Sequence, residues 1–334
     1  MSDAANHAET ARAPEVISMG NLLVEVMRLS VDEPLGRVGG TFAGPFPSGD
    51  PAIYIDAVAR LGHTAGYLGA VGQDDFGRCI LERFARDAVD FSHGRVLADR
   101  TTGVAFVAYF KDGSRRFIFH WRDAASGQLD PAQVQAAYFR NARWLHLTGS
   151  TLAINESSRA AAYRALEVLP AGAQVSFDPN IRPEVLTVEQ IRDLCRPVLD
   201  RADIFLPSAG EAMMFTGAGS DEDGCRALAA TGKLVVLKQG ARGCTVFEQG
   251  SEVAVPGFAV PEVDPTGGGD CFCAGFTAGL LEGLRPLDAA CFANAVGALA
   301  VTRRGPMEGA PTRQEVLALM AAQGVGARGG SVDL

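Results

Sequence analysis

Short apolar runs alternate with amphipathic stretches along most of this chain, and that alternation limits its possible folds more than any other feature. An apolar strand over 65–71 is expected between helices over 52–61 and 75–88. Further strands are expected at 144–147, 175–177, 204–206 and 235–238, and further helices near 156–168, 188–199, 211–215 and 224–230. Strands that alternate with helices favour right-handed crossovers, so we predict an α/β fold with a mainly parallel sheet covered by helices on both faces.

Two glycine- and proline-rich β segments interrupt this alternation. The first, over about 22–49, follows a buried strand at 15–21, and the second, 101–121, has the pattern of a hairpin with its turn at 111–114. We predict that the two segments form a small sheet that acts as a lid. Such a lid would exclude water from a site at the carboxyl ends of the parallel strands, where ligands bind in sheets of this kind.

The composition is typical of a globular protein that handles small molecules. With 334 residues and 47% hydrophobic content, the chain can bury an ample core, and we predict one domain over 15–325 with mobile tails at 1–14 and 326–334. A net charge of −9 disfavours nucleic acid or an anionic membrane as a partner. No apolar run is long enough to span a bilayer, and the first residues contain no signal-peptide core, so we expect a cytoplasmic location. The seven cysteines are scattered, which favours reduced and mostly buried thiols.

Three consecutive glycines, Gly267, Gly268 and Gly269, precede Asp270 and an apolar helix over 272–281. Glycines allow several backbone N–H groups to surround an anion, and the dipole of the following helix favours a phosphate there. A carboxylate beside such a site opposes phosphate binding unless it has a chemical task. For Asp270 that task would be to remove a proton from a hydroxyl that attacks the phosphate. A flexible turn is the alternative for the three glycines taken alone.

The segment Asp-Pro-Thr-Gly-Gly-Gly-Asp over 264–270 resembles the C-terminal signature of the ribokinase-like (PfkB) carbohydrate kinases, usually Asp-Thr-x-Gly-Ala-Gly-Asp. Gly268 stands where the family normally has alanine. The resemblance covers roughly residues 15–320. It implies the ribokinase-like fold, an anion hole at Gly267 to Gly269 and Asp270 as the catalytic base. It also implies ATP and Mg²⁺ as cofactors, and K⁺, which many relatives bind.

Other motifs resemble the family's sugar and nucleotide segments. Gly49 and Asp50 lie in a stretch similar to the N-terminal Gly-Gly sugar motif, in which Ser48 replaces one glycine. The resemblance assigns six residues to the nucleotide and its surroundings: Ser208, Glu211, Lys238, Gly240, Gly243 and Asn294. Glu211 is the residue that the resemblance connects, indirectly, with the metal ion. Ser208 departs from the Asn of the family's Asn-x-x-Glu pattern.

Two arginine motifs bear on the class of substrate. Asp178, Asn180 and Arg182 resemble the Asp-x-Asn-x-Arg segment of fructokinases and 2-keto-3-deoxygluconate kinases, and Arg122 resembles an arginine of the latter. Two guanidinium groups in one pocket would suit a carboxylate, because the planar group pairs with it through two hydrogen bonds. Fructokinases carry similar arginines, which can serve hydroxyls or phosphate. The resemblance to tagatose kinases and fructokinases therefore keeps neutral ketoses open.

The resulting prediction is a kinase that transfers the γ-phosphate of ATP to a primary hydroxyl of a ketohexose, of tagatose or fructose type, or of a 2-keto-3-deoxy sugar acid. Its expected partners are the sugar and ATP, with a homodimer formed through the lid. A nucleoside kinase of the same fold is one alternative, although the segment around Asp178 favours sugars. A non-catalytic sugar sensor is another, but a sensor would not need Asp270 as a base.

Overall fold

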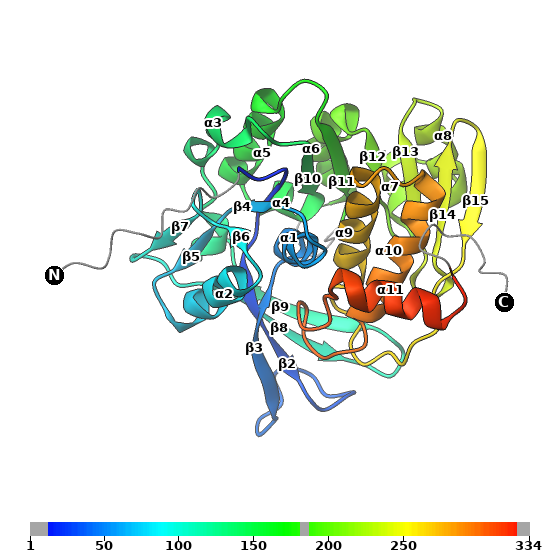
Figure 1. Cartoon of the computed structure of the whole chain (residues 1–334). Helices are drawn as coiled ribbons and strands as arrows, with labels where there is room; N and C mark the ends of the chain where they lie inside the picture. The colour runs from blue at the N-terminus through cyan, green and yellow to red at the C-terminus, as the bar shows by residue number, and fades with distance from the viewer. Residues whose placement is uncertain (1–12, 181–186, 326–334) are drawn as a thin grey trace.

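The computed structural model describes residues 13–180 and 187–325 (Figure 1). Its central sheet has nine strands in the order β15-β14-β13-β12-β11-β10-β1-β4-β6. These strands are β1 (Val16–Met19), β4 (Ala65–Leu68), β6 (Val89–Asp90), β10 (Trp144–Thr148), β11 (Gln174–Asp178), β12 (Ile204–Phe205), β13 (Leu234–Lys238), β14 (Cys244–Glu248) and β15 (Ser251–Val255). Neighbours pair in parallel, except β13 with β14 and β14 with β15. The predicted mainly parallel sheet is confirmed.

The strands expected from 144 to 238 agree with β10 to β13 to within one residue at each end. One strand prediction is wrong. The apolar run 65–71 is divided at Gly69, and its second half, β5 (Ala70–Gly72), leaves the central sheet to pair with β7 (Arg95–Leu97). A Cβ atom on Gly69 would lie 2.7 Å from the ring of Tyr67, so the absence of a side chain permits this close turn.

Helices cover both faces of the central sheet, as predicted. One face carries α1 (Asp50–Arg60), α2 (Asp75–Arg86), α9 (Gly268–Leu281), α10 (Pro286–Ala300) and α11 (Arg313–Ala322). The other carries α3 (Ala136–Phe139), α4 (Gly149–Ile154), α5 (Glu156–Val168), α6 (Val188–Arg201), α7 (Glu211–Thr216) and α8 (Asp221–Ala229). Successive strand residues point to opposite faces, so Val236 belongs to the first core and its neighbours Val235 and Leu237 to the second.

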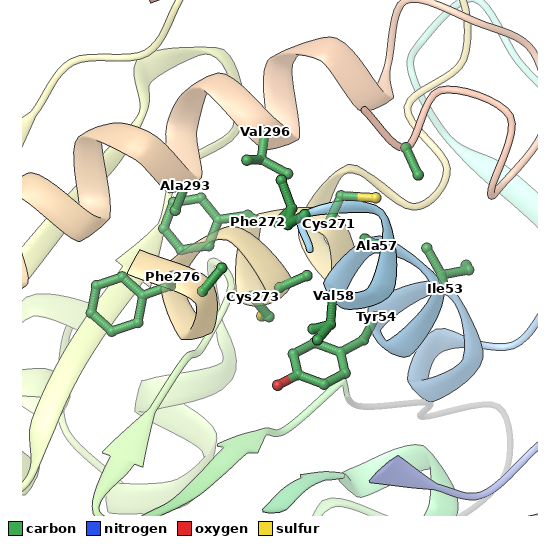
Figure 2. Close-up of a cluster of buried hydrophobic side chains, with 14 of the residues drawn as sticks. Ile53, Tyr54, Ala57, Val58, Cys271, Phe272, Cys273, Phe276, Ala293 and Val296 are labelled. Atoms are coloured by element: carbon green, nitrogen blue, oxygen red, sulfur yellow. The ribbon is translucent and has the colours of Figure 1, made fainter. Parts of the chain in front are cut away.

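Helix α9 packs between α1 and α10, and Figure 2 shows the side chains at this contact. Residues 271–279 of α9 are buried throughout. At Gly275 a Cβ atom would lie 2.9 Å from the Cα atom of Ala293, so glycine allows α10 to approach this closely. Tyr54 of α1 donates a hydrogen bond of 2.9 Å to Thr277. These contacts fix the axis of α9, and therefore the position of the glycines at its N-terminus.

A separate four-stranded sheet, which we call the lid sheet, projects from the main body (Figure 1). Its order is β3-β2-β8-β9, with β2 (Leu23–Arg28), β3 (Phe42–Ser48), β8 (Gly103–Tyr109) and β9 (Arg115–His120). Strands β2 and β8 pair in parallel. Strand β3 pairs antiparallel with β2, and β9 pairs antiparallel with β8. The two β segments predicted over 22–49 and 101–121 therefore form one sheet. Its closure over a ligand remains a prediction.

Parts of the predicted tails lie outside the described residues. This applies to 1–12 and 326–334, whereas Pro14 is buried and approaches Gly66. All seven cysteines have free thiols, six of them buried, as predicted. Within the described ranges, no helix is both long and apolar enough to cross a membrane.

Candidate active site

A cavity of about 310 Å³, which we call the polar cavity, lies between the lid sheet and the carboxyl ends of the central strands. Among the residues predicted from the sequence, it is lined by Gly49, Asp50, Asp178, Asn180, Ser208, Glu211, Lys238, Gly267, Gly269 and Asp270. These residues come from five separate segments of the chain. Because ligands bind where parallel strands end, their convergence there makes the polar cavity the candidate ligand site.

Asp50 is held on one side of the polar cavity by partners from distant segments. Its Oδ1 accepts a hydrogen bond of 2.8 Å from Asn21 Nδ2, and its Oδ2 one of 2.5 Å from Ser150 Oγ. Gly49 precedes α1 with φ of 114°, and a Cβ atom there would lie 2.4 Å from the backbone oxygen of Asn21. Asn21 and Ser150 were missed in the sequence, because neither lies in a motif and both reach Asp50 only through the fold.

The three glycines form the N-terminus of α9, which also lines this cavity. Gly267 is the N-cap residue with φ of 81°, and a Cβ atom on it would lie 2.3 Å from the backbone oxygen of Pro306. The first hydrogen bond of the helix runs from Cys271 N to Gly267 O, so the preceding N–H groups have no acceptor within the helix. Asp270 in the first turn lines the cavity beside them. This arrangement suits an anion next to a carboxylate.

Lys238, at the end of β13, also lines the polar cavity. Its Nζ is 2.5 Å from Asp178 Oδ2 and 3.6 Å from Cys273 Sγ, and the residue is 9% exposed. Burial alone would lower the pKa of Lys238, but the carboxylates of Asp178 and Glu211 raise it above its usual value. The side chain is therefore a buried ammonium ion. Asn180, two residues beyond Asp178, also lines the cavity.

A second cavity of about 500 Å³, the glycine-rich cavity, adjoins the first. It is lined by the predicted nucleotide residues Gly240, Gly243 and Asn294, and by small residues of α10. At Gly243, with φ of 94°, a Cβ atom would lie 2.2 Å from the backbone oxygen of Val255, so this turn requires glycine. The Asn294 amide donates to the backbone oxygens of Val255 and Pro256 and fixes the rim.

Ser208 and Glu211 form a turn beside Lys238. Glu211, the first residue of α7, accepts a hydrogen bond of 2.6 Å at its Oε2 from the N–H group of Ser208. The Glu211 residue is 7% exposed. Within the described residues, no group of three or more His, Cys, Asp or Glu side chains could hold a metal ion. A single carboxylate at this place fits a Mg²⁺ ion that is held mainly by phosphate oxygens and water.

Of the two predicted arginines, the described residues include Arg122, and the convergence of both in one pocket stays a prediction. Arg122 lines a different hollow of about 990 Å³ with Asp74 and His120, and it does not line the polar cavity. Arg182 lies outside the described residues. The guanidinium group that does line the polar cavity belongs to Arg115 of β9.

Strand β9 ends at His120, so Arg122 lies beyond it. Phe117, Phe119 and Trp121 line both the polar cavity and the hollow that contains Arg122. Within β9, the alternate residues Arg115, Phe117 and Phe119 face the polar cavity. This period of two was visible in the sequence and could have identified Arg115.

The lid sheet is tied to the glycine segment by Tyr109 at the end of β8. Its hydroxyl donates to Asp264 Oδ1 at 2.9 Å and lies 2.6 Å from Thr266 Oγ1. Asp264 also accepts hydrogen bonds from the N–H groups of Thr266 and Gly305. Burial and the neighbouring Asp264 carboxylate raise the pKa of Tyr109, so the phenol remains a donor. The lid sheet is thus joined directly to the residue before Gly267.

A carboxylate, a helix N-terminus and a buried ammonium ion lie where two cavities adjoin, and these are groups that suit phosphoryl transfer to a small molecule. Residues 45–313 match the model of the pfkB family carbohydrate kinases, and the chain belongs to this family. The predicted family, fold and enzyme class are confirmed, which disfavours the non-catalytic sensor.

Three relatives illustrate the similarity. The chain is 32% identical over 320 residues to fructokinase-1 of Oryza sativa subsp. japonica, covering 92% of this chain and 98% of the relative. A solved Escherichia coli structure, named as a ribokinase II and holding ATP and Mg²⁺, is 37% identical with a TM-score of 0.86 over 92% of this chain and 99% of that one. A fructokinase double mutant from Vibrio cholerae O395, with fructose, ADP and potassium ion bound, is 29% identical to this chain with a TM-score of 0.77. The match covers 92% of this chain and 98% of that one.

Proposed function

We propose that this carbohydrate kinase transfers the γ-phosphate of ATP to a primary hydroxyl of a neutral ketohexose of the fructose or tagatose type. One observation carries the choice of substrate class. The described lining of the polar cavity contains more carboxylates, Glu25, Asp50, Asp178, Glu211 and Asp270, than cationic groups, Arg115 and Lys238. This surplus of negative charge opposes a sugar acid, whereas carboxylates are good acceptors for sugar hydroxyls.

The sugar would lie in the polar cavity against Asp50 and Asn21. Asn21 Oδ1 is buried, and among the described residues nothing donates a hydrogen bond to it, so a sugar hydroxyl can supply the missing donor. Asp50, with both oxygens oriented by Asn21 and Ser150, presents its remaining lone pairs to a second hydroxyl.

ATP would lie in the glycine-rich cavity, with its γ-phosphate at the N-terminus of α9. Asp270 accepts the proton of the sugar hydroxyl as that oxygen forms its bond to the γ-phosphorus. The bond between this phosphorus and the β–γ bridging oxygen breaks, and ADP leaves with the electron pair. The N–H groups at Gly267 to Gly269 stabilise the charge on the phosphoryl oxygens. Bound Mg²⁺ would neutralise phosphate charge, with Glu211 as the candidate to orient its water ligands.

The experiment is a comparison of kcat/KM for fructose, tagatose and 2-keto-3-deoxygluconate under saturating MgATP. We expect at least a tenfold preference for one of the neutral ketoses, equivalent to about 1.4 kcal/mol in transition-state binding. A preference for the sugar acid would reject the proposed substrate class. In that case Arg115→Lys should raise the KM for the acid, because lysine keeps the charge but loses the paired donors.

A further inference from the structure

The two cavities share a small set of lining residues. Lys238, Pro265 and Gly269 line both the polar and the glycine-rich cavity. A phosphoryl group that moves from a ligand in one cavity to a ligand in the other must pass these residues. Lys238 is the charged side chain among these three residues, so it is the one that can interact electrostatically with the phosphoryl group.

The ammonium group of Lys238 is close to the glycine segment. A Cβ atom built on Gly269 would lie 3.8 Å from Lys238 Nζ, with no nearer atom of another segment. The backbone at Lys238 is fixed, because its N–H donates a hydrogen bond of 2.8 Å to the backbone oxygen of Pro207, two residues after the neighbouring strand β12. The side chain therefore extends from a rigid strand end to the N-terminus of α9.

Asp178 fixes the direction of this side chain. Its Oδ2 lies 2.5 Å from Lys238 Nζ, and both residues are more than nine-tenths buried. An ammonium group has three N–H donors, and the described contacts to Asp178 and Cys273 account for two of them. A donor is thus left for an anion in the space beside Gly269.

We propose that Lys238 is a catalytic residue whose ammonium group contacts the transferring phosphoryl group, and that Asp178 is the positioning residue that directs it there. The inference rests on the proposed ATP-dependent transfer. The ammonium stays protonated throughout and stabilises charge on the phosphoryl oxygens while the new oxygen–phosphorus bond forms and the bond to ADP breaks. The proton of the acceptor hydroxyl goes to Asp270.

The test compares Lys238→Met with Lys233→Met. Lys233 adjoins the other end of β13, and its Nζ donates to the backbone oxygens of Asp200 and Ala202, so it controls for loss of a lysine without touching either cavity. For each variant, calorimetry measures the affinity for ADP alone and for ADP with aluminium fluoride, in the presence of the sugar that the wild-type protein phosphorylates. Aluminium fluoride mimics the phosphoryl group in transfer, so this readout does not depend on turnover.

We expect Lys238→Met to lower kcat by about 10²–10³ and to weaken binding of the ADP–aluminium fluoride complex by a similar factor. Its affinity for ADP should stay within about threefold of wild type, and Lys233→Met should change neither quantity. Asp178→Asn keeps the ammonium group but no longer fixes its direction. Its kcat and its affinity for the ADP–aluminium fluoride complex should therefore fall between those of Lys238→Met and Lys233→Met. A kcat within tenfold of wild type, or equal weakening for ADP and its fluoride complex, would overturn the proposal.

A buried charge left alone by Lys238→Met could prevent folding. The double variant Asp178→Asn/Lys238→Met removes both charges and is then tested in the same way, with Asp178→Asn as its reference. If the wild-type protein phosphorylates a sugar acid and not a ketose, the proposed substrate class fails, while the ratio of the two affinities measured with that acid still decides the role of Lys238.

Discussion

The polar cavity and the glycine-rich cavity meet at Gly269 but are built by different means. Acceptors in the polar cavity are buried side chains whose directions are fixed by partners far away in sequence, as Asp50 is by Asn21 and Ser150. The glycine-rich cavity depends on absent or small side chains, at Gly240, Gly243, Gly297 and Ala298 among others. The polar cavity should therefore be sensitive to loss of a charge, and the glycine-rich cavity to added bulk.

The largest expected effect lies where the cavities meet. Asp270→Asn should lower kcat by about 10²–10⁴, the usual range for a lost general base, because the amide cannot accept the hydroxyl proton. KM for both substrates should change little, since neither cavity loses volume. Steady-state kinetics with each substrate varied in turn make the measurement, and a kcat within tenfold of wild type would remove Asp270 from this role.

Two neighbouring glycines give a matched pair of variants. Gly267→Ala should lower kcat by about 10²–10³, because its φ of 81° is unfavourable for alanine and the new Cβ would meet Pro306 O at 2.3 Å. Gly268→Ala should have a small effect, since its Cβ would meet only the end of the Val301 side chain at 2.8 Å. Equal losses in the two variants would show that the geometry of Gly267 is not what forms the anion site.

In the polar cavity, Asp50→Asn should raise KM for the sugar by about 10- to 100-fold, corresponding to about 1.4–2.7 kcal/mol for a lost acceptor in a buried network. KM for ATP should stay within about twofold. Asp75→Asn is the control, because that carboxylate is 89% exposed on α2. A parallel rise in both KM values for Asp50→Asn would contradict the separation of the two cavities.

In the glycine-rich cavity, Ala298→Phe should raise KM for ATP by about tenfold, or roughly 1.4 kcal/mol, because the ring would fill space beside Gly297 and Phe272. KM for the sugar should not change. Ala321→Phe on the exposed side of α11 is a control of equal size. Unchanged ATP kinetics in Ala298→Phe would place the nucleotide elsewhere.

Local patterns predicted much of the fold and the region where the cavities meet. Periodicity located β10 to β13, and the glycines before Asp270 marked the N-terminus of α9, because strand alternation and an anion-binding turn are properties of short segments. The antiparallel strands β14 and β15 were not predicted. The turn between β13 and β14 is both a hairpin turn and part of the glycine-rich cavity.

Long-range partnerships could not be predicted in this way. Ser150 contacts Asp50 across 100 residues and Tyr109 contacts Asp264 across 155, and no local pattern links such pairs. Arg122 was assigned from a family motif and lies beyond the end of β9, whereas Arg115 within β9 lines the polar cavity and was not assigned. Lys238 was assigned to the nucleotide from its loop, whereas its position beside Asp178 depends on two strands that neighbour one another only through β12.

The most direct test of the account is the identity of the product. The wild-type protein is incubated with MgATP and fructose or tagatose, and the product is examined by phosphorus and carbon NMR. We predict a ketohexose monophosphate, formed in equal amount to ADP, whose phosphorus couples to a primary carbon. Formation of ADP without a sugar phosphate, or a phosphate on a secondary hydroxyl, would contradict transfer from the glycine-rich cavity to a primary hydroxyl held beside Asp270.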